Sequence, residues 1–250
     1  MKYKRFLPLI TPVLIWLLSQ TFLITPRFFY STLALGTLLI IVSVKLIADR
    51  LAAKNWLSWT VAPLLFFLGA TTYTAIIVSH FWIQIIFLLI VWFLFSYLRD
   101  LYQLADGAEA RRAKLDNLLV GGSFLALAAL AGVLFGLPAF LNWPLAITLL
   151  AFALIGWLSF SQFFPVNESL AKQRGLVIMS VIILTELAGV FSLLPLNFNI
   201  LALFLAISYY LLLTIMRLNG QGAVNRRSLI VPLLLSVMAI GLLLLSARWL

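Results

Sequence analysis

Glu186 is the residue of this sequence best suited to chemistry, because it is the only acidic side chain inside an apolar run of membrane-spanning length. A carboxylate within a lipid bilayer costs several kcal/mol unless it is protonated, paired or hydrated. Glu186 therefore predicts either a site for a proton, an ion or a substrate, or a hydrogen bond that holds two helices together. The other acidic residues fall in charged segments between apolar runs: Asp49, Asp100, Asp106, Glu109, Asp116 and Glu168.

Four further polar residues are candidates for the same site, namely Thr71, Thr72, Gln84 and Tyr209. Glu186 precedes a proline turn by nine residues, which places it ~13 Å from the outer end of its run at about 1.5 Å per residue. Thr71, Thr72 and Gln84 lie at comparable or shallower depth, and Tyr209 is expected within reach of a neighbouring carboxyl group. Together these residues predict a polar cavity that opens outward. Desolvation penalises the charged form of a carboxyl group, so we expect Glu186 to be protonated and hydrogen-bonded. In the alternative interpretation, the threonines bond to their own backbone.

One segment resembles a catalytic motif without its metal ligands. Residues 106–111, DGAEAR, resemble the DGxxAR opening of the CDP-alcohol phosphotransferases, which hold a divalent metal with several aspartates. The family has a further aspartate three residues before this segment and two more downstream, and at these positions this sequence has Gln103, Leu125 and Ala129. One carboxylate cannot organise such a site, so we expect no catalytic residue, metal or cofactor here. The single histidine, His80, is expected in an aromatic belt at an outer turn.

The composition excludes most soluble classes of protein. Hydrophobic residues make up 64% of the 250 and charged residues 10%, whereas globular domains average about 45–50% and about 25%. The sequence therefore predicts an all-α, polytopic transmembrane helical bundle. The net charge of +10 is spread over short segments between apolar runs, which favours anionic lipid headgroups over nucleic acid as the partner.

Apolar runs divide the chain into about nine spans, arranged as four hairpins plus a final helix in one domain covering residues 1–250. Tight, nearly uncharged turns connect the two spans of each hairpin, and longer basic segments connect successive hairpins. The predicted spans are residues 6–24, 28–48, 57–78, 81–98, 118–137, 143–164, 175–194, 197–216 and 229–247.

The distribution of basic residues predicts the orientation of the chain. Of the 17 Lys and Arg residues, only Arg27 and Arg248 fall among the uncharged connections or beyond the last span. Because short basic loops stay in the cytoplasm, we expect a cytoplasmic N-terminus and an outer C-terminus. The longest basic segment, residues 99–117, is expected to be an extension of the fourth helix followed by a turn. Its alternative is an amphipathic segment that lies on anionic lipid.

Residues 184–215 resemble a family of polytopic membrane proteins from candidate-phyla bacteria, a domain of unknown function. The resemblance rests on Glu186-Leu187-Ala188, followed by Ser192 and Pro195 before another span. It implies the cytoplasmic (inner) membrane of a bacterium and no particular activity.

Two functions are compatible with these features. The first is transport or binding of a small or hydrophobic substrate at Glu186, which requires a hydrated polar pocket. The second is a non-catalytic membrane scaffold or assembly factor that binds other membrane proteins, which requires a tight interior and an exposed stripe of small residues. A membrane enzyme needs clustered acids or bases at one face, and the outer segments contain almost none.

Overall fold

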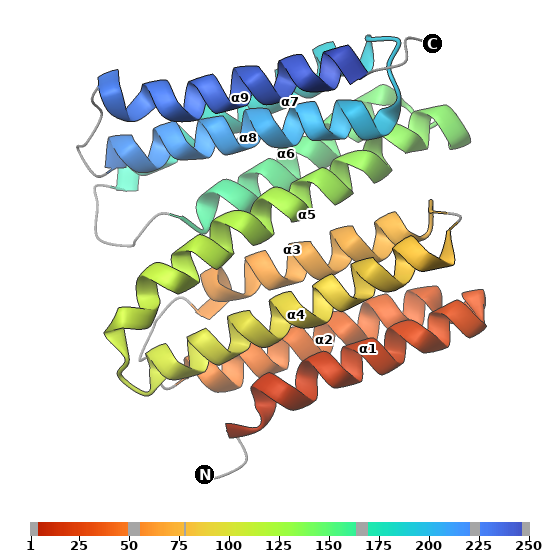
Figure 1. The fold of residues 1–250 in the computed structure, drawn as a ribbon, viewed down its shortest axis with the longest axis vertical. Helices are drawn as coiled ribbons and strands as arrows, with labels where there is room; N and C mark the ends of the chain where they lie inside the picture. The colour runs from red at the N-terminus through yellow and green to blue at the C-terminus, as the bar shows by residue number, and fades with distance from the viewer. Residues whose placement is uncertain (1–4, 50–55, 78, 164–169, 221–225, 247–250) are drawn as a thin grey trace. The chain divides into compact units, whose positions relative to one another are not determined.

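The computed structural model describes residues 5–49, 56–77, 79–163, 170–220 and 226–246. In these ranges all regular secondary structure is helical, so the predicted all-α class is confirmed (Figure 1). Two short 3-10 helices, η2 (Pro26–Phe28) and η3 (Glu109–Arg111), precede α2 and α5. The α-helices are α1 (Leu7–Ile24), α2 (Phe29–Ala48), α3 (Trp56–Thr74), α4 (His80–Ala105), α5 (Arg112–Leu141), α6 (Leu145–Ser161), α7 (Leu170–Ser192), α8 (Phe198–Gly220) and α9 (Arg226–Ser246).

Each predicted apolar run corresponds to one of these helices. The predicted helical extension within residues 99–117 is also confirmed, because α4 continues to Ala105 and a short turn leads into α5. Several positions used in the sequence analysis lie outside the described ranges. They are the predicted span ends at 78, 164 and 247, the residues Glu168 and Arg248, and four more of the 17 basic residues, Lys2, Lys4, Arg50 and Lys54.

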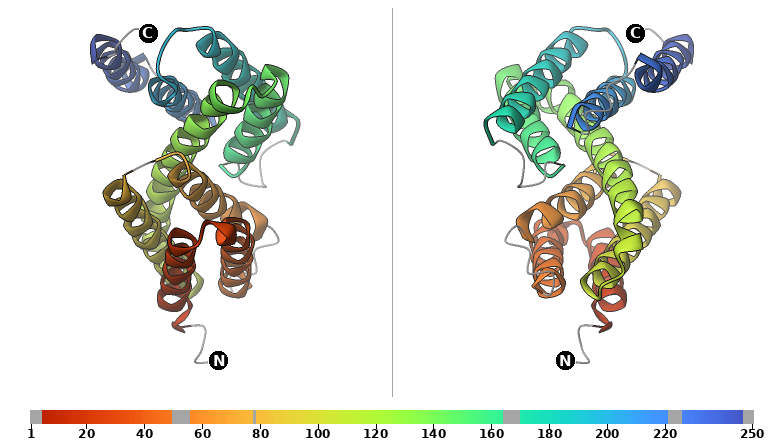
Figure 2. Two further views of the ribbon diagram at one scale, coloured as in Figure 1. Left: turned by 90° about the vertical axis from the view of Figure 1, so that its right-hand side faces the viewer. Right: turned by 90° about the vertical axis from the view of Figure 1, so that its left-hand side faces the viewer.

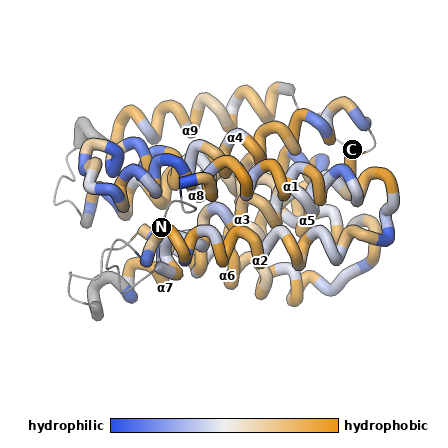
Figure 3. Tube along the Cα trace, turned by 90° about the horizontal axis from the view of Figure 1, so that it is seen from below, coloured by the Kyte–Doolittle hydropathy of each residue, from blue (hydrophilic) through white to orange (hydrophobic). Residues whose placement is uncertain are grey.

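Within the described ranges, six helical segments are long and apolar enough to cross a bilayer: α1, η2 with α2, α4, η3 with most of α5, most of α7, and α8. Two shorter apolar helical segments, Leu145–Ser161 and Leu229–Leu245, accompany them. By helix length and hydropathy the chain is thus a polytopic membrane protein in contact with a lipid bilayer. Figure 3 shows hydrophobic residues along the lengths of the helices and hydrophilic residues gathered towards helix ends.

The chain falls into two compact units, Met1–Ala126 and Leu127–Leu250. That these two units together form the single domain expected over residues 1–250 stays a prediction. In the first unit, α1 packs on α2 and α4, and α3 packs on α2 and α4. Figure 2 shows these four helices from two further directions.

Polar contacts bind α1 to its neighbours within the first unit. The Thr11 hydroxyl lies 2.7 Å from that of Ser43 on α2. The amide groups of Gln20 and Gln84 form a reciprocal pair, with both N–O distances 3.1 Å. Where side-chain amides lie in an apolar bundle, such pairing satisfies a donor and an acceptor on each residue. The pair therefore fixes the register of α1 against α4.

In the second unit α7 packs between α6 and α8, and α8 also packs on α9. Aromatic rings fill the spaces between helices. The rings of Phe135 on α5 and Phe152 on α6 have centroids 5.0 Å apart, and those of Phe160 and Tyr209 are 4.9 Å apart. These contacts set the rotation of each helix about its own axis, and so decide which side chains face outward.

Candidate functional site

Glu186 lies on α7 and is exposed on the surface of the second unit. The residues one helical turn before and after it, Ile182 and Val190, are 51% and 56% exposed. Among the described residues, Glu186 forms no hydrogen bond or ion pair. Its carboxyl group is thus a polar group in the middle of an outward-facing apolar surface.

The opposite side of α7 explains this orientation. Leu184 and Ala188 are completely buried, and Gly156 of α6 allows a close approach, since a Cβ there would lie 3.2 Å from a Leu184 methyl carbon. Ser180, also buried, donates a hydrogen bond to the sulfur of Met216 on α8 at 2.9 Å. Because successive residues of an α-helix are separated by about 100°, burial of positions 184 and 188 turns position 186 outward.

Tyr209 is engaged within the same unit. It is completely buried on α8, and its hydroxyl donates a hydrogen bond of 3.4 Å to the backbone carbonyl of Ser159 on α6. The hydroxyl beside Glu186 is also used, because Thr185 donates to the carbonyl of Val181 on its own helix at 2.8 Å. The structure therefore does not bring Tyr209 to Glu186 as a hydrogen-bond partner.

The other three candidates belong to the first unit. Gln84 pairs with Gln20 as described, and Thr72 donates to the carbonyls of Leu68 and Gly69 on its own helix at 2.7 and 3.1 Å. Thr71 is completely buried, and within the described part of the chain its hydroxyl has no hydrogen-bond partner. These side chains contribute to packing inside the first unit, and their place in a substrate site stays a prediction.

No family model matches this sequence, and no curated protein or solved structure matches it either. Among the described residues, no group of three His, Asp or Glu side chains is placed to hold a metal ion.

Sequence reasoning missed a charge cluster around a buried aspartate near the end of α4. Asp100, which was expected in a charged segment outside the spans, is 1% exposed. One carboxylate oxygen, Oδ1, lies 3.5 Å from Nη1 of Arg111, and the other, Oδ2, lies 3.7 Å from Nζ of Lys114. A carboxylate that is buried this deeply needs such partners, because an unpaired charge in an apolar interior costs several kcal/mol.

The turn after α4 brings these basic residues back to Asp100. Gly107 adopts a φ of +97°, the left-handed conformation that favours glycine. Its N–H donates to the carbonyl of Leu104 and the N–H of Ala108 to that of Gln103, at 3.1 and 3.0 Å. This pair of bonds is the Schellman motif, which ends helices at glycine. The DGxxAR-like segment thus has a structural role: its glycine reverses the chain, and its arginine pairs with Asp100.

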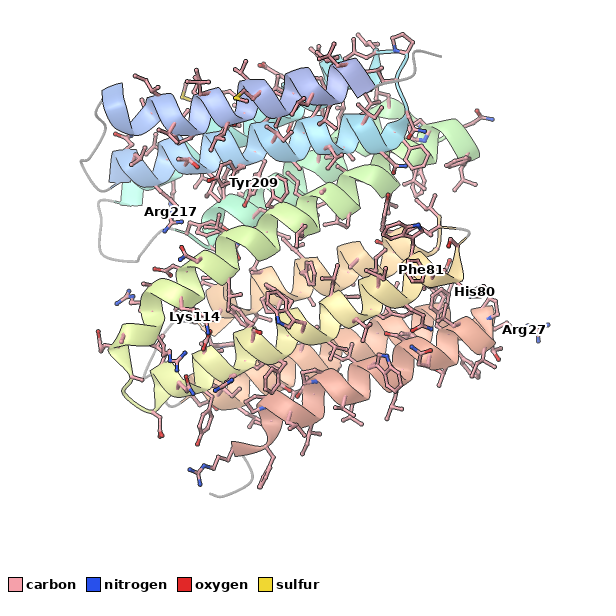
Figure 4. The ribbon with its side chains drawn as sticks, in the orientation of Figure 1. Arg27, His80, Phe81, Lys114, Tyr209 and Arg217 are labelled. Carbon is pink, nitrogen blue, oxygen red and sulfur yellow. The ribbon has the colours of Figure 1, made fainter. Side chains whose placement is uncertain are left out.

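The two ends of the first unit differ in character. Figure 4 shows Arg27 and His80 at one end and Lys114 at the other. His80 is exposed at the start of α4, where the rings of Phe81 and Trp82 lie 5.7 Å apart. The predicted outer turns and the predicted cytoplasmic turn are therefore at opposite ends of the same helices, as a spanning bundle requires.

Proposed function

We propose that this protein is a non-catalytic scaffold of about nine spans that binds another membrane protein through the outward face of α7. The observation that carries the proposal is the exposure of Glu186 between apolar residues of a membrane helix, without a partner among the described residues. A carboxyl group at the centre of a span costs about 2.5–3.5 kcal/mol by insertion scales. A neighbouring helix that offers a hydrogen bond removes much of this cost, so the face suits protein better than lipid.

Transport or binding of a small substrate, the first function expected from the sequence, is now the alternative. Three of the four side chains that were expected to line its cavity with Glu186 make hydrogen bonds elsewhere: Gln84 with Gln20, Thr72 with its own helix and Tyr209 with Ser159. Gln84 and Tyr209 thereby join helices within their own units, which agrees with the tight interior expected of a scaffold.

The proposal includes the topology. Nine spans require α3, with 19 residues, and the 17-residue apolar segments of α6 and α9 to cross the bilayer beside the six longer ones; about 17–25 residues suffice. The N-terminus then lies in the cytoplasm and the basic turns face anionic headgroups. Placement in the inner membrane of a bacterium rests on the family resemblance at residues 184–215.

Extraction from the native membrane into a mild detergent, followed by light scattering, tests the scaffold. The wild-type chain is expected in an assembly heavier than its own 28.0 kDa. Glu186→Leu is expected to release a folded monomer, because Glu186 makes no hydrogen bond within its unit among the described residues. Leu235→Ala, a change at a 59% exposed residue of α9, is the matched control and keeps the assembly. A wild-type chain that is already monomeric contradicts the proposal. A Glu186→Gln variant that assembles normally but loses the growth phenotype of its host supports transport.

A further inference from the structure

The exposed residues of α7 recur with the spacing of a helix–helix seam. Between residues 175 and 193, we write the sequence as heptads abcdefg with Glu186 at position a. Every exposed residue then falls at a, d, e or g: Gly175, Ile178, Met179, Ile182, Glu186, Val190 and Leu193. The buried residues fall at b, c or f: Val177, Ser180, Leu184 and Ala188. Positions a and d form the seam of a two-helix coiled coil, and e and g flank it.

The seam has the shape for close packing. Met179, Ile182 and Leu193 are 61%, 51% and 78% exposed, so their side chains are free to interdigitate with another helix. Gly175 occupies a d position, and a Cβ built there would meet no atom within 4 Å. Small residues at such positions allow two backbones to approach in a membrane. Glu186 is the single ionisable residue of this seam, and a lone polar residue at position a sets register and the number of helices.

We propose that a second copy of this chain occupies the seam, so that two α7 helices cross in parallel about a twofold axis along the membrane normal. This inference rests on the proposed function and names its partner. All copies of a membrane protein share one orientation, so the twofold axis places Glu186 opposite Glu186 at the same depth. A different protein must supply a polar group at that depth, whereas a second copy always does.

The chemistry of the carboxyl group is self-complementary. A protonated carboxyl group has one O–H donor and one free acceptor oxygen. Two such groups related by a twofold axis therefore satisfy each other with two hydrogen bonds. The first unit already contains the amide equivalent, the reciprocal pair of Gln20 and Gln84. The second copy thus completes a hydrogen-bonding group that the described part of one chain leaves open.

Cysteine cross-linking tests this inference directly, because the chain contains no cysteine. Single variants Met179→Cys, Ile182→Cys and Leu193→Cys, expressed in full-length protein and oxidised in membranes, are expected to give disulfide-linked dimers. Leu88→Cys on α4 and Leu235→Cys on α9 are matched controls, since both residues are apolar and similarly exposed, at 60% and 59%. Equal cross-linking at the controls and on α7 overturns the seam.

A second substitution distinguishes a specific dimer of α7 helices from disulfides that form when two chains collide at random. Glu186→Leu in the Met179→Cys background is expected to weaken dimerisation about tenfold, equivalent to about 1.4 kcal/mol, because apolar side chains gain little by leaving lipid for one another. Glu186→Gln is expected to preserve the dimer, as an amide also pairs reciprocally. A leucine variant that dimerises like wild type overturns the inference.

The failures of the two proposals are distinguishable. If mild extraction yields an assembly that contains one copy of this chain and a different protein, the scaffold function holds and the second copy is excluded. If extraction yields a monomer and no α7 variant forms a dimer, both proposals fail. Co-purification of two differently tagged copies from one membrane, abolished by Glu186→Leu, supports both.

Discussion

The hydroxyl of Tyr97 on α4 donates a hydrogen bond of 2.6 Å to the backbone carbonyl of Trp59 on α3. Four residues after Trp59 comes Pro63, inside α3. Proline has no N–H, so the carbonyl four residues before it loses its intrahelical partner. Tyr97, which is completely buried, supplies the missing donor from the neighbouring helix. This bond replaces the one that Pro63 removes, and it joins the two helices.

This relationship predicts a compensating pair of substitutions. Tyr97→Phe is expected to destabilise the protein by about 1–2 kcal/mol, because it leaves the half-buried carbonyl of Trp59 unpaired. In a Pro63→Ala background, the backbone N–H restored at position 63 can donate to the Trp59 carbonyl. Tyr97→Phe is therefore expected to destabilise this background much less than it destabilises the wild-type protein. Unfolding by denaturing detergent, measured for all four combinations, checks the coupling. Equal costs in the two backgrounds contradict the assignment.

The buried Asp100 predicts a second compensation. The double variant Arg111→Ala, Lys114→Ala leaves the buried carboxylate of Asp100 without a basic partner. It is expected to lower the free energy of unfolding by about 3 kcal/mol. Each single change costs less, since one partner remains and the two basic side chains are 37% and 59% exposed. Adding Asp100→Asn to the double variant is expected to restore most of the loss. Thermal unfolding in detergent measures the series, with the exposed neighbour Arg112→Ala as control. If Asp100→Asn does not restore the stability of the double variant, an unpaired buried charge is not the cause of its loss.

Two adjacent glycines of α5 are expected to respond in opposite ways to alanine. A Cβ at Gly122 overlaps the ring of Phe93, whereas a Cβ at Gly121 meets nothing within 4 Å. The Phe93 ring cannot move freely, because it packs against Phe66 and Tyr97 with centroids 4.5 and 5.9 Å apart. Gly122→Ala should therefore destabilise by about 1–3 kcal/mol, and Gly121→Ala should stabilise by about 0.5–1 kcal/mol. The same unfolding assay compares the two variants, and equal shifts of their stability in one direction contradict the close approach of Gly122 to Phe93.

Cysteine labelling tests the predicted orientation of the chain in the membrane, because the sequence contains no native cysteine. Ser79→Cys, at the turn between α3 and α4, is expected to react with a membrane-impermeant maleimide added outside the cell. Ala110→Cys, in η3 before α5, is expected to react only after the membrane is opened, because its basic neighbours are expected to keep this segment in the cytoplasm. Both residues are exposed. A reporter fused after residue 250 tests the odd number of spans, which a cytoplasmic signal there would refute.

Helix limits were predictable from the sequence because each depends on a local property. A run of about 20 apolar residues marks a span, and prolines or polar residues mark its ends, so α1 and α2 begin and end within about a residue of the prediction. The extension of α4 beyond residue 98 was also predicted, but the burial of Asp100 within it was less accessible, since the sequence around this residue is strongly charged. The available signal for the charge cluster was Gly107, seven residues beyond Asp100. A Schellman turn at this glycine reverses the chain direction and places Arg111 and Lys114 beside the carboxylate of Asp100.

The rotation of each helix was not predictable in the same way. In a soluble protein the apolar stripe of a helix identifies its buried face, but in a bilayer both lipid and neighbouring helices accept apolar residues. The neighbours of Glu186 are Ile, Leu, Ala and Val on almost every side. Burial of Leu184 and Ala188 against α6 and α8, which depends on Gly156 far away in the sequence, is what turns Glu186 outward. Its role in binding, like those of Thr71, Thr72, Gln84 and Tyr209, therefore stays a prediction.

The reciprocal pair of Gln20 and Gln84 has a consequence for synthesis. The two residues are 64 positions apart, and at about 5–20 residues per second a ribosome needs about 3–13 s to make the second after the first. During that interval the side-chain amide of Gln20, in the first span, lies unpaired in or near lipid. Thr11 of the same span obtains its partner Ser43 sooner, after 32 residues. Until α4 emerges, Gln20 depends on headgroups, water or the insertion machinery for its hydrogen bonds, so slow synthesis is expected to lengthen the time before the first bundle closes.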